Sequence, residues 1–379
     1  MNNINHDAHT DDDELTIEDE GTLLPGFEKK YKDQMRQIVT QRLDLPISTL
    51  PAMLKEQIKI DPEFQRRDRW DETRQSRLIE SLLMNVPIPP IFLGEDEYGF
   101  YVVLDGRQRL TAIRNFLSNI LTLKGLSVWD DLNGLTFDDL IKRGLDKHLT
   151  RRFVSAIAIL KESSPIVKYD VFDRLNTGGV KANEMEVRNA VFQGPFTDQL
   201  HQLSRLPAFC DLWEIPKDKI LAETNRIYQR MEDLAIVLRF FALFKPHEMD
   251  GPFRDHLSDY MQRRNLTYKK DPKIGETDKI LFTQAVSNAW TIFGKDAFRS
   301  PHKEKKGPRS IPLAEAVLIG LAELNPAKIT AEVAEKIRES LSALCKDDTF
   351  LKAISAGTNG KGAIESRIEM ARDAFKSKV

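Results

Sequence analysis

The stretch FYVVLDGRQRLTAIRNFLS, residues 100–118, decides the fold of the first half of this chain. Its apolar beginning, residues 100–104, predicts a strand, and Asp105-Gly106 predicts a tight turn. From Arg107 onward, apolar residues recur at helical spacing and predict a helix to about Ser118. Upstream, residues 91–93 form a second apolar run, separated from the first by polar residues and Gly99. We therefore expect a β-hairpin that leads directly into a helix.

Further elements of both kinds flank this unit. Asp71 can N-cap a helix that carries an apolar stripe over residues 74–86 and is ended by Pro87, Pro89 and Pro90. The run from Phe153 to Leu160 is apolar on both alternating faces, which predicts a central strand that is covered on both sides. Nearer the N-terminus, we expect helices over residues 27–43 and around residues 50–58. The first half thus mixes strands and helices around a small sheet.

The second half has no convincing strand beyond Pro195, whereas helical periodicity recurs along it. The expected helices cover residues 184–193, 197–205, 225–244, 251–264, 277–297, 311–324, 330–345 and 360–376. The fold class is therefore α+β, with a small α/β domain followed by an all-α domain. The expected boundaries are a disordered acidic tail over 1–25, the α/β domain over 26–195 and the helical domain over 196–379.

Composition limits the classes of protein to consider. The 379 residues carry a formal charge of −2, but the first twenty residues hold eight acids and no Lys or Arg. The remainder has 56 basic and 50 acidic residues, which is compatible with an anionic partner. Two cysteines are too few for a disulfide framework or a zinc cluster. Without an apolar leader or a long apolar run, we expect a cytoplasmic protein that does not span a membrane.

The turn Asp105-Gly106-Arg107-Gln108-Arg109 is the sharpest candidate site. A helix that starts after a strand offers unpaired N–H groups and the positive end of its dipole, and two arginines add fixed charge. These features predict a site for phosphate or another oxyanion. The alternative is structural: Asp105 caps the helix while the arginines pair with surface acids.

Two other clusters carry similar chemistry. Arginine beside an aromatic residue suits base stacking or phosphate binding, and a glycine turn can present backbone amides to a ligand. The first cluster contains Gln65, Arg66 and Trp70, and the second contains Arg174, Asn176, Thr177, Gly178 and Gly179. The structural alternatives are a core tryptophan with solvated arginines and a glycine helix cap.

Residues 183–189 form a fourth candidate. Asn183 followed by Glu186 is the pattern of a capping box, which is the structural interpretation of Glu186. In the functional interpretation, Glu186 orients a metal-bound water or acts as a base, and Arg188 and Asn189 bind the ligand.

Basic, turn-rich stretches in the second half are candidates for DNA phosphate contacts. Their residues are Arg263, Arg264, Lys303, Lys305, Lys306 and Arg309. The chain contains neither a P-loop nor a dinucleotide fingerprint, and it lacks the HExxH and CxxC metal motifs. Its seven histidines are scattered, so the sequence does not predict a His-metal nuclease site.

Five ordered motifs between about residues 40 and 195 resemble one family. They are FQRRDRW (64–70), SRLIESLL (76–83) with the following prolines, DGRQRLTAI (105–113), FDRLNTGG (172–179) and EVRNA (186–190). Together they resemble the N-terminal domain of GmrS/GmrD-type modification-dependent restriction proteins, a branch of the ParB/sulfiredoxin-like superfamily. The resemblance implies a ParB-like α/β fold that binds a nucleoside triphosphate through a DGQQR motif. Arg107 stands where the family usually has Gln, which leaves it open whether hydrolysis is kept.

The resemblance also implies a role. Family members couple nucleotide turnover to cleavage or sensing of phage or modified DNA, and cleavage belongs to a separate His-Asn-His-type nuclease domain. We therefore expect a nucleotide-binding and NTP-hydrolysing component of a bacterial anti-phage system, with Mg²⁺ as a companion and no nuclease site of its own. Expected catalytic residues are Asp105, Gln108, Arg109 and Glu186, and the other residues named above bind nucleotide or DNA. The alternatives are a non-catalytic DNA-binding sensor or a scaffold for a separate nuclease subunit, and an oligomer is compatible with each.

Overall fold

The structure, a computed structural model, describes residues 38–60, 70–96, 99–163, 168, 169, 171, 174, 183–300 and 308–379. The expected acidic tail, residues 1–25, lies outside these ranges. The chain from Ile38 to Val379 forms one unit. Two hydrophobic cores lie within it, one under the sheet of the first half and one among the helices of the second. The α+β fold class is confirmed, and the domain boundaries stay predictions.

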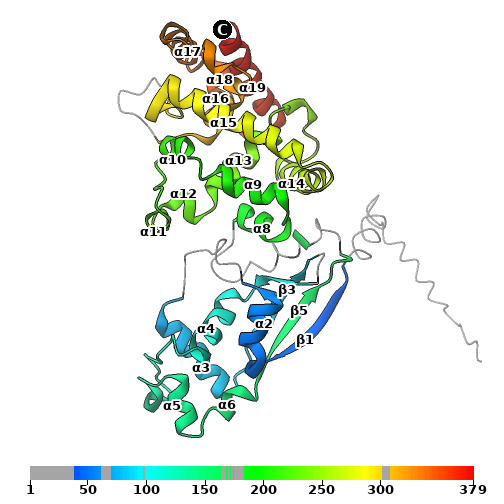
Figure 1. Ribbon diagram of the computed structural model, residues 1–379, viewed down its shortest axis with the longest axis vertical. Helices are drawn as coiled ribbons and strands as arrows, with labels where there is room; N and C mark the ends of the chain where they lie inside the picture. Colours follow the sequence, from blue (N-terminus) through cyan, green and yellow to red (C-terminus); the bar gives the residue numbers. More distant parts are fainter. Residues whose placement is uncertain are drawn as a thin grey trace, which may run out of the picture. The chain divides into compact units, whose positions relative to one another are not determined.

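The first half is organised around a mixed five-stranded sheet (Figure 1). Its strands are β1 (Thr40–Pro46), β2 (Ile58–Lys59), β3 (Ile91–Glu95), β4 (Tyr101–Asp105) and β5 (Phe153–Ile159), in the order β1-β5-β3-β4-β2. β1 is antiparallel to β5 and β3 is antiparallel to β4, whereas the β3–β5 and β2–β4 pairs are parallel. The predicted hairpin is confirmed, with a register shift between Phe92 and Leu93.

The helices of the first half share one hydrophobic core with this sheet. They are α2 (Leu50–Glu56), α3 (Glu72–Leu83), α4 (Arg107–Leu117), α5 (Phe137–Lys142) and α6 (Lys147–Thr150), with 3₁₀ turns at Ile47–Thr49 and Asp130–Leu132. Asp71 caps α3 as predicted, because its carboxylate accepts from the Arg74 N–H at 2.7 Å. Leu110, Ile113 and Phe116 of α4 are fully buried in the core against the sheet. This packing fixes where α4 begins.

Three sequence expectations for the first half were wrong in part. The helix expected around residues 50–58 ends at Glu56, and Ile58–Lys59 is strand β2. The helix expected over residues 27–43 is contradicted at its end, because Thr40–Pro46 is strand β1. Leu43 and Leu45 alternate with polar residues at the period of a strand, and both face the core beside β5. The expectation that β5 is covered on both sides also fails at its start, since Phe153 is 59% exposed.

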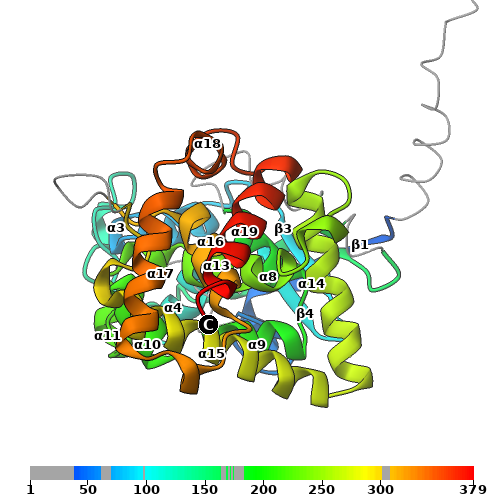
Figure 2. The ribbon, with the colours of Figure 1, turned by 90° about the horizontal axis from the view of Figure 1, so that it is seen from above.

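The second half of the described chain is helical (Figure 2). Its helices are α8 (Glu184–Val191), α9 (Pro195–Leu203), α10 (Pro207–Trp213), α11 (Lys219–Ala222), α12 (Arg226–Gln229), α13 (Glu232–Ala242), α14 (Phe253–Lys270), α15 (Lys273–Phe293), α16 (Ile311–Leu321), α17 (Ala331–Leu344), α18 (Asp348–Ser355) and α19 (Lys361–Lys376). Single 3₁₀ turns lie at Pro246–Glu248, Gly294–Asp296 and Pro326–Lys328. None of the helices in the described ranges is long and apolar enough to cross a membrane.

The buried helix α16 organises this half. Residues Leu313–Leu321 are all buried, and α19 packs closely along the helix. A Cβ at Gly320 would lie 2.9 Å from the Phe375 ring and 3.2 Å from the Ala371 backbone, so glycine permits the close approach. Glu315 of α16 is an ion-pair partner of both Arg239 and Arg367. These two ion pairs connect α13, α16 and α19 through the buried Glu315 carboxylate.

Candidate functional site

The turn between β4 and α4 has the backbone that its sequence predicts. Gly106 is the N-cap of α4 with φ +92°, a backbone conformation that residues other than glycine rarely adopt. A Cβ at this position would lie 2.8 Å from Cγ1 of Ile91. No side chain forms a capping hydrogen bond at the start of α4. The start of α4 thus has the backbone geometry of an anion site.

Arg109 connects this turn to Pro89 and Pro90, the two residues that precede β3. Its guanidinium pairs with the Asp105 carboxylate at 2.6 Å and donates to the carbonyl oxygens of Pro89 and Pro90. The Arg109 side chain is only 11% exposed, so these internal acceptors use much of its donor capacity. The structural alternative from the sequence is wrong for Asp105, because Gly106 is the N-cap and no side chain caps α4. For Arg109 it is right in that the guanidinium pairs with an acid, which is Asp105 itself, so these two residues form an ion pair with each other.

Trp70 lies beside the first turn of α4. The Gln108 side-chain oxygen accepts from the Trp70 N–H at 3.3 Å, and the Gln75 amide donates to the Trp70 carbonyl at 2.8 Å. The Arg74 guanidinium lies 4.5 Å from the centre of the indole ring. Trp70 and Gln108, predicted from separate motifs, are therefore brought together. Gln65 and Arg66 lie outside the described residues.

Arg107 is the first residue of α4 and is half-buried. Its position at the start of the helix places its charge where the N–H groups and the dipole favour an anion. Arg109, two residues further on, is turned toward Asp105 and the proline carbonyls. By its place in the helix, Arg107 is the arginine of this motif best suited to meet a phosphate.

A second polar cluster surrounds α8, whose N-terminus has the predicted capping box. The Asn183 side chain accepts from the Met185 and Glu186 N–H groups at 2.9 Å. In return, the Glu186 carboxylate accepts from the Asn183 N–H at 3.0 Å. Asn183 also donates to the Arg230 carbonyl at 2.5 Å. The structural interpretation of Glu186 thus has direct contacts in its favour, and its catalytic role stays a prediction.

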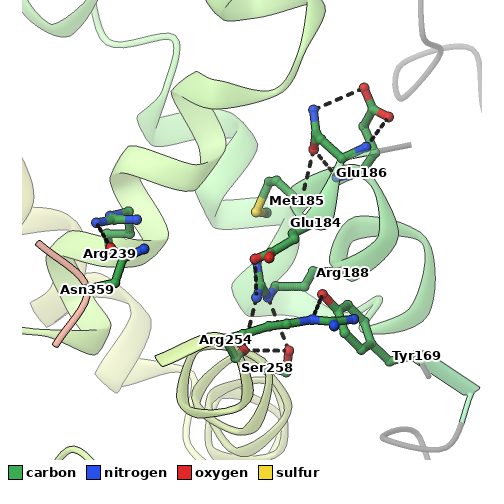
Figure 3. A network of polar contacts seen from close by, with 10 residues as sticks. Tyr169, Glu184, Met185, Glu186, Arg188, Arg239, Arg254, Ser258 and Asn359 are labelled. Atoms are coloured by element: carbon green, nitrogen blue, oxygen red, sulfur yellow. Dashed lines mark hydrogen bonds and ion pairs between the residues drawn. The ribbon is translucent and has the colours of Figure 1, made fainter. Parts of the chain in front are cut away.

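Arg188 is buried within this cluster (Figure 3). Its guanidinium donates to the Ser258 hydroxyl at 3.1 Å, to Glu184 at 3.0 Å and to the Arg254 carbonyl at 2.9 Å. Tyr169 lies beside both arginines, with 5.6 Å from its ring centre to Arg188 and 4.8 Å to Arg254. These contacts join α8 to α14 around an aromatic ring.

The Tyr169 hydroxyl accepts from Nε of Arg254 at 3.1 Å. Burial raises the pKa of Tyr169, so the phenol stays neutral at physiological pH. Sequence reasoning missed Tyr169, Arg254 and Ser258. Tyr169 lies just before the FDRLNTGG motif and could have been included with it, but no sequence signal links Arg254 or Ser258 to residues some seventy positions earlier.

Asn189 is also internal. It is almost completely buried and forms a hydrogen bond of 2.9 Å with Nε2 of His201. Burial lowers the pKa of His201 to about 4, so the imidazole is neutral at physiological pH. Arg174 is exposed, and residues 176–179 lie outside the described ranges. The nucleotide roles of these residues stay predictions.

The predicted DNA-binding residues divide into three groups. Arg264 pairs with both carboxylate oxygens of Asp278, and Arg309 pairs with Glu214 at 2.9 Å and donates to the Leu212 carbonyl. The neighbouring guanidinium of Arg309 lowers the pKa of Glu214. Arg263 is exposed. Lys303, Lys305 and Lys306 lie outside the described residues.

Arg263 borders a hollow of about 590 Å³ on α14 that acidic side chains dominate. Its charged lining residues are Glu248, Asp250, Asp255, Asp259 and Arg263. Carboxylates beside Arg263 disfavour the approach of a phosphate backbone. Across the part of the chain that the structure describes, no three His, Cys, Asp or Glu side chains are grouped as metal ligands.

The comparisons with known proteins bear on the segment that contains both clusters. Residues 50–193 match the family model described as the GmrSD restriction endonuclease, N-terminal domain. The matched segment begins at α2 and ends after α8, so it includes Trp70, the β4–α4 turn and Arg188. The resemblance expected from the motifs is therefore confirmed for this segment. Neither the curated proteins nor the solved structures gave a significant match to the chain.

Proposed function

We propose that this chain binds a nucleoside triphosphate at the start of α4 and hydrolyses it as a component of a restriction-type phage-defence system. The observation that supports this proposal is the β4–α4 turn within the matched segment, where Gly106 leaves the helix N-terminus without a side-chain cap beside Arg107. The N–H groups and the guanidinium of Arg107 would hold phosphate oxygens. Trp70, fixed by Gln108, offers a ring for stacking on the base.

The contacts of Arg109 assign it a different part in this proposal. The Arg109 guanidinium contacts the Asp105 carboxylate and the carbonyls of the proline segment, so it positions the turn. Loss of Arg109 would therefore disturb the turn and also remove a positive charge that could stabilise a phosphoryl group. Arg109 is therefore a positioning residue in our proposal, and Arg107 is the phosphate contact. Mg²⁺ is expected to accompany the nucleotide. Asp105 and Glu186 are the carboxylates expected to orient this ion, but each already has a partner within the fold. The proposal therefore includes no step that depends on the ion.

Nucleotide binding and phosphate release, measured separately, test the proposal. We expect Arg107→Ala to weaken binding of a fluorescent triphosphate at least ~tenfold, with the melting temperature of each variant measured alongside. Arg109→Ala should lower both the melting temperature and the rate of phosphate release. Arg263→Ala removes an exposed arginine from α14 and serves as the matched control. Equal binding by wild type, Arg107→Ala and the control would refute the assignment.

We further propose that a separate subunit supplies any nuclease activity. Two of the described histidines have internal partners, since His201 bonds to Asn189 and Nε2 of His256 lies 3.0 Å from the Ala242 carbonyl oxygen. Incubation of the purified chain with phage DNA, Mg²⁺ and each triphosphate tests this point. Intact DNA in every reaction is the expected result, and cleavage by the chain alone would refute the proposal.

A further inference from the structure

Strand β1 forms one edge of the sheet. Within the described residues it pairs with β5 alone, and Figure 1 draws it at the margin of the sheet. Two hydrogen bonds show which residues of β1 direct their backbone N–H and C=O groups toward β5. Leu160 N–H donates to the Val39 carbonyl, and Ile47 N–H donates to the Arg152 carbonyl, each at 2.9 Å. Odd-numbered residues therefore point their backbone groups toward β5.

The even-numbered residues of β1 then point their backbone groups away from β5, because successive residues alternate in an antiparallel ladder. These residues are Thr40, Arg42, Asp44 and Pro46. Pro46 has no N–H, and here the missing donor lies on the open side of the strand, as expected for proline in an edge strand. The open edge thus offers three N–H groups and four carbonyl oxygens, of which the Pro46 carbonyl already accepts one hydrogen bond from the Thr49 hydroxyl at 3.2 Å and keeps one lone pair.

The side chains along this edge carry opposite charges at a spacing of two. Arg42 and Asp44 are both exposed and lie on the same face of the sheet. The Ser155 hydroxyl donates to Asp44 at 2.9 Å across the β1–β5 pair, which orients the carboxylate on that face. A strand with this pattern is complementary to an antiparallel copy of itself.

We propose that β1 pairs with β1 of a second copy of this chain, antiparallel and centred on Leu43, so that two five-stranded sheets become continuous. In this register Arg42 lies opposite Asp44 of the second copy, and the two residues exchange backbone hydrogen bonds. Thr40 N–H donates to the Pro46 carbonyl of the second copy. Every N–H on the open edge thereby finds an acceptor.

The charges also exclude the neighbouring register. Centring the pair on Arg42 would use the same outward backbone groups but would place Arg42 opposite Arg42 of the second copy. Like charges directly opposite one another destabilise a strand pair, whereas opposite charges stabilise it. The pairing centred on Leu43 also brings the two Leu43 side chains together on the face that carries the core. This inference concerns assembly and is independent of the proposed nucleotide site.

Charge reversal tests the pairing directly. Sedimentation velocity of the full-length chain should show a dimer for wild type at micromolar concentration. Arg42→Asp and Asp44→Arg should each raise the dimer dissociation constant at least ~tenfold, since each places like charges opposite one another. The double reversal, Arg42→Asp with Asp44→Arg, restores complementarity and should return the dissociation constant to within about threefold of wild type. Arg143→Asp, which reverses an exposed arginine at the end of α5, is the matched control and should leave the dimer intact.

A backbone variant distinguishes strand pairing from a general charge effect. Thr40→Pro removes an N–H that points away from β5, so the melting temperature should stay within a few degrees of wild type while the dimer weakens. A wild type that is monomeric at about 100 µM would overturn the proposal, as would single reversals that dimerise as well as wild type. A double reversal that stays monomeric while it keeps the wild-type melting curve would also overturn it.

Discussion

Asp233 gives a quantitative prediction for the dependence of stability on pH. It lies in the first turn of α13, it is fully buried, and neither carboxylate oxygen has a hydrogen bond of ordinary geometry in the described part of the chain. Burial raises its pKa to about 7, although the nearby Leu234 amide, Ser204 hydroxyl and Arg205 guanidinium each lower the pKa in part. The native state therefore keeps a proton that the unfolded chain releases near pH ~4.

This proton sets the sign of the effect. Between about pH 4 and pH 7 the native state binds more protons than the unfolded state, so the contribution of Asp233 to stability falls as the pH rises. A shift of about three pKa units corresponds to a loss of ~4 kcal/mol across that window, at ~1.4 kcal/mol per unit. Asp233→Asn keeps the shape of the side chain and cannot ionise. The variant should therefore gain stability relative to wild type as the pH rises.

Urea unfolding at about pH 4.5, 6 and 8 measures this difference. His201 acts in the opposite sense, because its lowered pKa favours the native state as the pH rises from about 4 to 6.5. Since both proteins contain His201, the difference in the free energy of unfolding between Asp233→Asn and wild type isolates Asp233. We expect this difference to grow by several kcal/mol between the lowest and the highest of these pH values. A difference that stays constant would refute the reasoning.

Three substitutions test other parts of the fold. Gly106→Ala should cost about 1–3 kcal/mol in urea unfolding, because alanine is strained at φ +92° and its Cβ would meet Ile91; an unchanged midpoint would contradict this. Glu315→Gln should cost about 3–5 kcal/mol, because it leaves the buried Arg367 and the partly buried Arg239 without their shared counter-charge; a loss below about 1 kcal/mol would show that the two ion pairs are dispensable. Gly320→Ala should cost about 1–3 kcal/mol by separating α16 from α19, and a stabilised variant would show that the contact has room to spare.

Local signals in the sequence predict the elements that short-range physics determines. The β3–β4 hairpin, the Asp71 cap and the Asn183–Glu186 capping box all form as predicted, because each depends on residues close together along the chain. Most of the later helices also lie where their periodicity places them. Three short helices, α10, α11 and α18, were missed because each has only about one or two turns of pattern.

Long-range contacts explain what the sequence could not predict. The first four residues of strand β1 were expected to be helix, because the partner strand β5 is remote in the sequence and leaves no local signal. The acceptors of Arg109 were also hidden, since nothing in the DGRQR motif indicates that the Pro89 and Pro90 carbonyls face it. The same holds for Arg188, whose partners Ser258 and Arg254 belong to α14. The sequence predicts several residues of the site, but only the fold shows which of them form hydrogen bonds or ion pairs with one another.

The separation between β1 and β5 also affects how the chain is made. Thr40 pairs with Ile159, so β1 leaves the ribosome long before the strand that completes its ladder. At typical rates of synthesis, ~5–20 residues per second, the delay is on the order of ten seconds. During this time the β3–β4 hairpin can form locally, whereas the sheet cannot close. Translation through β5 is therefore the step at which the first half of the protein can become native.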